Sequence, residues 1–185
     1  MRLLCSAPLL ILCLACKPAA PPAVASEPAP RYYLGTTTTT SPDGATAYGP
    51  PFPVAVRRTL DPRSGTIDEY VVHPGSAHPT HLRRDPGAGP QAIFTAEDDQ
   101  RSFTGTITFT GPDWAWTAWT YAITLSDGSG TLRGSGRADA RSITTDKLFH
   151  GPDGQPRARI REQLDEVDLP TFTRTRDELL RQPAP

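Results

Sequence analysis

The sequence predicts an all-β protein, an antiparallel meander that closes into a barrel, with a short C-terminal helix. A β-sandwich is the alternative. Of 185 residues, 21 are proline and 23 are threonine, which disfavours a helical bundle because proline breaks helices and β-branched threonine favours strands. Short stretches of alternating polarity recur between turn signals, as in a series of hairpins. A closed sheet is favoured because closure removes exposed strand edges.

The first sixteen residues have the pattern of an export signal. Arg2 precedes an apolar run over residues 3–15, which is too short to span a bilayer as a helix. All three cysteines of the chain lie in this stretch, so the domain that follows can form no internal disulfide. We therefore expect residues 1–15 to be a signal peptide.

The end of this stretch resembles the lipobox of bacterial lipoprotein signals, in which small residues precede a cysteine that becomes the lipidated first residue. Leu14-Ala15-Cys16 carries the resemblance, although the usual order places Leu three residues before the Cys, where this chain has Cys13. The resemblance implies acylation, with palmitate among the acyl chains, at Cys16. Lys17, rather than Asp, follows the cysteine and implies sorting to the outer membrane. An ordinary secretory signal and an uncleaved anchor are the alternatives.

Two segments separate the signal from the main domain. Residues 16–30 are the lipidated cysteine and a Pro/Ala-rich linker, expected to be an extended spacer that holds the domain off the bilayer. Residues 31–52 form a Thr-rich N-terminal segment, in which the five threonines at 36–40 are either a strand or a flexible stretch. The β domain then covers residues 53–185.

Turn signals rich in Gly, Pro and Asp divide the β domain into seven or eight strands. A long loop is expected over residues 73–90, which hold four prolines and three glycines. The strands are expected at 54–60, 66–72, 91–96, 102–110, 116–125, 131–137, 142–150 and 157–167, with a helix at 173–181.

The clearest strand, residues 102–110, alternates apolar residues or glycine with threonine, which indicates one buried and one solvated face. Aromatic residues and glycines of this and the next two strands share the buried face, and such glycines would hollow the barrel for one small apolar ligand. The alternative is a filled core in which the glycines relieve sheet curvature. The residues expected to bind this ligand are Phe103, Gly105, Ile107, Phe109, Trp119, Tyr121 and Gly134. The run of hairpins with a late helix also resembles lipocalin-like barrels in topology, over about residues 53–180, without their GxW signature.

Three further groups of residues have a functional and a structural interpretation. His73, His78 and His81 are expected to be solvated loop residues, because their spacing matches no common zinc pattern; a zinc site with Asp85 is the alternative. Trp114 and Trp116 either pack under a loop or form a contact surface. The arginines at 157, 159 and 161 are expected to form cross-strand ion pairs, and binding of an anionic headgroup or sugar acid is the alternative.

No motif for catalysis, a dinucleotide or a phosphate loop is present, so no catalytic residue, metal or cofactor is assigned. The net charge of −1 gives no reason to expect a nucleic-acid partner. We expect a lipoprotein of the cell envelope, anchored in the outer membrane and facing the periplasm or the surface. Its partner is a small apolar or lipid-like ligand in the barrel, or, alternatively, an envelope protein that meets the outer surface of a filled core.

Overall fold

The computed structural model describes residues 28–61, 64, 66–84, 91–97, 102–109, 118–125, 127–139 and 141–183. At residues 82–84, 91–97, 102–109 and 121 it describes only the main chain. The exception is Thr108, whose side chain is also described. The expected signal peptide, Cys16 and most of the linker lie outside these residues, as do Asp85, Trp114 and Trp116. No helix among the described residues is both long and apolar enough to cross a membrane.

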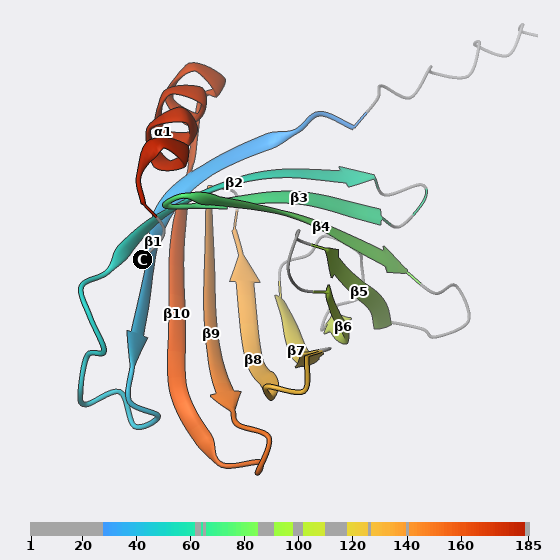
Figure 1. Ribbon diagram of the computed structural model, residues 1–185. Coiled ribbons are helices and arrows are strands. Elements are labelled where there is room, and N and C mark those ends of the chain that lie inside the picture. Colours follow the sequence, from blue (N-terminus) through green and yellow to red (C-terminus); the bar gives the residue numbers. More distant parts are fainter. Residues whose placement is uncertain are drawn as a thin grey trace, which may run out of the picture.

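The described chain folds into strands and one C-terminal helix (Figure 1). Each strand pairs antiparallel with its neighbours in sequence, and β1 pairs with both β2 and β10, so the sheet closes into a barrel. The all-β class, the antiparallel meander and the C-terminal helix are therefore confirmed. The elements are β1 (Arg31–Thr40), β2 (Phe52–Asp61), β3 (Thr66–His73), β4 (Ser76–Arg84), β5 (Gln91–Glu97), β6 (Ser102–Phe109), β7 (Ala118–Leu125), β8 (Thr131–Ala138), β9 (Ser142–His150), β10 (Pro156–Val167) and α1 (Leu169–Arg181).

The five threonines at 36–40 lie in β1, which decides between the two interpretations of this run. β1 runs along β10 from Tyr32 opposite Val167 to Thr40 opposite Arg159, and on its other side it pairs with β2. Threonine suits this position because a β-branched residue packs well on a pleated sheet and its hydroxyl tolerates the solvated face. β1 thus supplies the pairing that closes the barrel.

The expected long loop at 73–90 is wrong over residues 73–84, and residues 85–90 lie outside the described residues. β3 continues to His73, a two-residue turn at Pro74-Gly75 follows, and β4 begins at Ser76. Gly75 has a φ of 71°, which an L-residue rarely adopts and which tight hairpin turns require. The prolines of this segment suggested a loop, but one of them starts the turn and Pro79 lies within the strand.

The barrel interior holds the main core in the described part of the chain. Buried apolar side chains from β1, β2, β3, β7, β9 and β10 pack together there. They alternate along each strand with residues of the outer face, as a pleated strand requires. The core residues are Tyr33, Val54, Val56, Ile67, Trp119, Ile143 and Leu164.

The C-terminal helix α1 covers the outer face of the barrel beside β1 to β4 (Figure 1). Phe172 and Leu179 are buried against Ala55 and Val72, and the ring of Phe172 lies 5.0 Å from that of Tyr32. The helix begins at Leu169, four residues before the expected start, because the Asp168 side chain accepts a hydrogen bond from the Thr171 N–H and caps the first turn.

Candidate functional site

The barrel wall from β1 to β7 carries three transverse rows of residues, which the strand register sets opposite one another. The first row is Thr38, Arg161, Asp146, Ser135 and Thr120. The second is Thr37, Glu162, Thr145, Gly136 and Trp119. The third is Thr36, Gln163, Thr144, Arg137 and Ala118. Because adjacent residues of a strand face opposite ways, the first and third rows share the outer face and the second row faces the interior.

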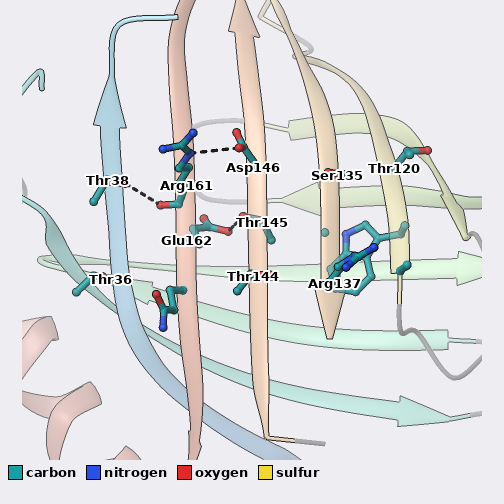
Figure 2. Close-up of a pocket in the computed structure, with 14 residues that line it drawn as sticks. Thr36, Thr38, Thr120, Ser135, Arg137, Thr144, Thr145, Asp146, Arg161 and Glu162 are labelled. Carbon is teal, nitrogen blue, oxygen red and sulfur yellow. Dashed lines mark hydrogen bonds and ion pairs between the residues drawn. The ribbon is translucent and has the colours of Figure 1, made fainter. Parts of the chain in front are cut away.

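A groove of about 650 Å³ lies over these rows, lined by every residue of them except Thr37 (Figure 2). Seven of the lining residues of the first and third rows are exposed, whereas the middle row is largely buried, so the groove opens on the outer face. Its outer-face side chains are hydroxyls, an amide, two guanidinium groups and one carboxylate, with Ala118 as the apolar member. Trp119 of the middle row also lines the groove, so the lining combines many hydrogen-bonding groups with apolar surface.

The carboxylate of the groove is shared between two arginines of β10. Arg159 donates two hydrogen bonds of 2.7 and 2.6 Å to the Asp146 carboxylate, and Arg161 Nε donates a third of 3.2 Å to the same group. The hydrogen bonds from Arg159, and then from Arg161, lower the pKa of Asp146 below its ordinary value despite some burial. Asp146 therefore stays ionised, and the pair of arginines carries one positive charge in excess.

A further positive charge stands at the other side of the groove. Arg137 is exposed, and no carboxylate of the described residues forms an ion pair with it. Figure 2 shows Arg161 beside Asp146 at one side and Arg137 at the other, with Ser135 and Thr144 between them. The groove is thus cationic at two separate points.

Behind the groove, the interior holds a polar cluster. Lys147 Nζ lies 2.9 Å from Glu162 Oε2, and the Thr145 hydroxyl donates to the same oxygen at 2.7 Å (Figure 2). Burial alone raises the pKa of Glu162, but the charge and hydrogen bond of Lys147 and the bond from Thr145 outweigh it and lower the pKa. Glu162 is therefore a buried, ionised and partnered carboxylate.

A histidine lies near this ion pair. The buried Nδ1 atom of His73 has no hydrogen-bond partner among the described residues, and its ring packs at 5.6 Å from Phe52. Burial lowers the pKa of His73; Glu162 opposes this effect, and His78 and Lys147 add to it. A neutral imidazole at this place adds no charge to the interior.

The expectation that three histidines lie in a solvated loop is wrong in its placement of all three, which lie in strands, and of the three only His81 is exposed. His73 and His78 lie in β3 and β4 with their rings 5.8 Å apart, while His81 lies on the opposite face, where Nδ1 meets the Asp68 carboxylate at 2.5 Å. Positions 78 and 81 of one strand face opposite ways, so the three imidazoles do not converge. No cluster of three metal-ligating side chains occurs within the described residues.

The register brings together the seven residues that the sequence predicts for ligand binding. Phe109 lies opposite Trp119, Ile107 opposite Tyr121, and Gly105 opposite Ile123. Phe103 pairs with Leu125, and Gly134 pairs with Tyr121. Trp119, Ile123 and Leu125 are buried, so this series of positions belongs to the interior.

Side-chain packing at Trp119 and Gly134 leaves little room there. A Cβ on Gly136 would collide with the indole of Trp119, and the Arg58 guanidinium of β2 lies 5.5 Å from the centroid of that indole. A Cβ on Gly134 would lie 2.6 Å from Lys147 Cα and would collide with the Asp146 carbonyl. At both positions, the absence of a Cβ lets another residue pack directly against the glycine backbone.

The groove itself is what sequence reasoning missed. Two signals for it were present, namely the threonine run of β1 and the alternating arginines of β10. Arg159 and Arg161 form the expected cross-strand ion pairs, both with Asp146 of β9, whereas Arg157 pairs with Asp153 of the preceding turn. The register that places Thr144, Ser135 and Arg137 beside them depends on hairpin geometry, which the sequence leaves open.

Comparisons with known proteins inform the fold alone. No protein-family model matches the chain, and no curated protein matches it. A protein of unknown function of the DUF3598 family from Nostoc punctiforme is similar in structure, with a TM-score of 0.51 and 12% identity over 74% of this chain. The match spans 47% of that protein, so the chain corresponds to about half of its length. The ywiB protein from Bacillus subtilis has a TM-score of 0.38 and 7% identity, covering 75% of this chain and 92% of that one.

Proposed function

We propose that this chain is a lipid-anchored lipoprotein of the cell envelope whose β-barrel is an interaction module, meeting its partner through the outer face of β1, β10, β9, β8 and β7. The observation that carries the proposal is the contrast between the two faces of this wall. The interior is packed and crossed by ion pairs, whereas the outer face holds an open groove of about 650 Å³.

The polar side chains of the barrel interior, among the described residues, argue against an apolar ligand beside them. The ion pairs Arg58–Glu69 and Lys147–Glu162 both face inward, and His73 lies close to the second. An apolar ligand beside these groups would cover charges without offering hydrogen bonds, which is costly. The groove has no such difficulty, since its polar groups are open to solvent or to a polar partner.

The N-terminal signal supports the anchored location. A cysteine that follows a short apolar run, and a proline-rich spacer before the barrel, together suit a domain held at a distance from a membrane. We expect labelled palmitate to be incorporated into the full chain and lost in Cys16→Ala. Label retained by that variant would contradict anchoring at Cys16.

Site-directed photo-crosslinking in the native host tests the interaction face. A crosslinking amino acid is placed at Ser135 or Thr144 in the groove, and at Asp153 or Glu178 as exposed positions outside it. We expect adducts with an envelope component from the two groove positions and none from the controls. Adducts that form equally at all four positions, or none at the groove positions, would contradict the proposal.

A second function, binding of a small apolar or lipid-like ligand inside the barrel, is favoured by the register of β6 and β7. Six of its seven expected residues lie at consecutive interior positions of these strands, next to the buried Ile123 and Leu125, and the seventh, Gly134, lies opposite Tyr121. This second function would be supported if a small apolar probe binds the parent chain but not Ile107→Arg, provided that the parent and the variant unfold at similar temperatures.

A further inference from the structure

We propose that the groove binds an acidic polysaccharide, a chain of sugars that carries carboxylates; this inference rests on the proposed outer-face function and names its partner. Two properties of the groove lead to it. The first is a pair of separated positive charges, and the second is a lining of hydroxyl and amide groups between them.

The charges call for an anion. Arg159 and Arg161 share the single carboxylate of Asp146, so one positive charge of the three groups is not neutralised. Arg137 adds another, and no described carboxylate pairs with it. Guanidinium groups bind carboxylates through two parallel hydrogen bonds, which makes carboxylates well suited to these two points.

The spacing calls for an extended anion. Arg161 and Arg137 lie two strands and two residues apart, which places their Cα atoms roughly 12 Å from each other on a sheet. Arg161 is also held against Asp146 of β9, the strand that lies between the two arginines (Figure 2). Two carboxylates on separate sugars can occupy both points, whereas one small anion occupies a single point.

The lining between the arginines calls for a polyhydroxylated ligand. Thr144 of β9 and Ser135 of β8 offer hydroxyl groups, and Gln163 of β10 offers an amide, at exposed positions of the groove. Thr120 of β7 adds a hydroxyl group beyond the strand of Arg137. These groups donate and accept hydrogen bonds, as sugar hydroxyls do. An acidic protein segment would also meet the arginines, but its side chains offer few hydroxyl groups to pair with those of the groove, and hexaglutamate tests it below.

Binding to defined oligosaccharides tests the inference. Residues 28–185 are titrated with tetragalacturonic acid, with neutral maltotetraose, with hexaglutamate and with inorganic phosphate. We expect the acidic tetrasaccharide to bind, and salt to weaken its binding. Maltotetraose, which lacks the carboxylates, and hexaglutamate, which lacks the hydroxyl groups, should each bind at least tenfold more weakly. Equal binding of maltotetraose, of hexaglutamate or of phosphate would overturn the inference.

Matched variants locate the binding. Arg137→Gln and Arg161→Gln each remove one charge from the groove, and Ser135→Trp fills it without changing its charge. Arg157→Gln removes the same charge from the same strand as Arg161 but outside the groove, where Arg157 pairs with Asp153. We expect about tenfold weaker binding for the first three variants and parental binding for the fourth. A loss at Arg157 equal to that at Arg137 would show nonspecific attraction and contradict the site.

Failure of the ligand assignment is distinguishable from failure of the proposed function. If no oligosaccharide binds while Ser135 and Thr144 still crosslink to an envelope protein, the acidic polysaccharide is wrong and the outer-face function stands. If the groove positions neither crosslink nor bind any sugar, both are wrong.

Discussion

At the scale of single residues, one tight contact in the barrel occurs where a glycine faces an aromatic ring. Gly136 is buried opposite Trp119, and the indole occupies the space that a Cβ would take. We predict that Gly136→Ala lowers the free energy of unfolding by about 1–3 kcal/mol through overpacking. Denaturant unfolding measures this.

The double-mutant cycle with Trp119→Phe is the control for that prediction. A smaller ring leaves room for the added methyl group, so the double variant should lose less than the sum of the two single losses. Strict additivity would show that the two side chains do not compete for the same space.

The buried ion pair of Lys147 and Glu162 gives a second prediction. Lys147→Met leaves the Glu162 carboxylate buried with the Thr145 hydroxyl but without its cation. We expect a loss of about 3–5 kcal/mol, because an uncompensated charge stays in the interior. The double variant Lys147→Met/Glu162→Leu should be more stable than Lys147→Met alone, and a double variant that is less stable would contradict the charge argument.

His73 makes stability depend on pH. Its pKa is lowered below 6.5 by burial, so at pH values just below 6.5 the unfolded chain binds a proton that the folded chain does not. Stability is therefore complete above about pH 6.5 and falls as the pH drops through the range below it. We expect His73→Phe to reduce the fall in melting temperature between pH 7 and pH 5.5. A variant whose melting temperature falls as steeply as that of the parent would exclude His73 as the cause.

At the scale of elements, α1 is held by one cap and two buried side chains. Asp168 caps the first turn through the Thr171 N–H, and Phe172 is buried against the barrel. We predict a loss of about 3–5 kcal/mol for Phe172→Ala and about 1 kcal/mol for Asp168→Ala, and almost none for the exposed Glu178→Ala. Equal losses for Phe172 and Glu178 would mean that α1 does not pack as described.

The elements also show how far sequence reasoning reaches. Strict alternation predicted β6 to within one residue, and β9, placed from the turn signal that follows it, begins and ends where expected. β4 was missed because it contains Pro79 and its residues do not alternate in polarity, and strand pairing with β3 overrides that local signal. The helix start was missed because the cap at Asp168 acts through a side-chain hydrogen bond rather than through apolar periodicity.

At the scale of the whole molecule, closure of the barrel creates the candidate site. β1 joins β10 and β2, and the resulting register sets Thr36 and Thr38 of β1 in line with Arg137 and Ser135 of β8. The residue types of the groove are visible in the sequence, but their juxtaposition depends on five strands meeting in one register. The fold class was therefore predictable and the site was not.

The central claim is that the barrel is filled and acts through its outer face, and native mass spectrometry tests it most directly. Residues 28–185, purified from a bacterial host without denaturation, should give the mass of the bare chain, because the described interior is packed and carries ion pairs. A bound apolar molecule of a few hundred daltons, retained by Ser135→Trp and lost on Ile107→Arg, would contradict the claim and place the ligand inside the barrel.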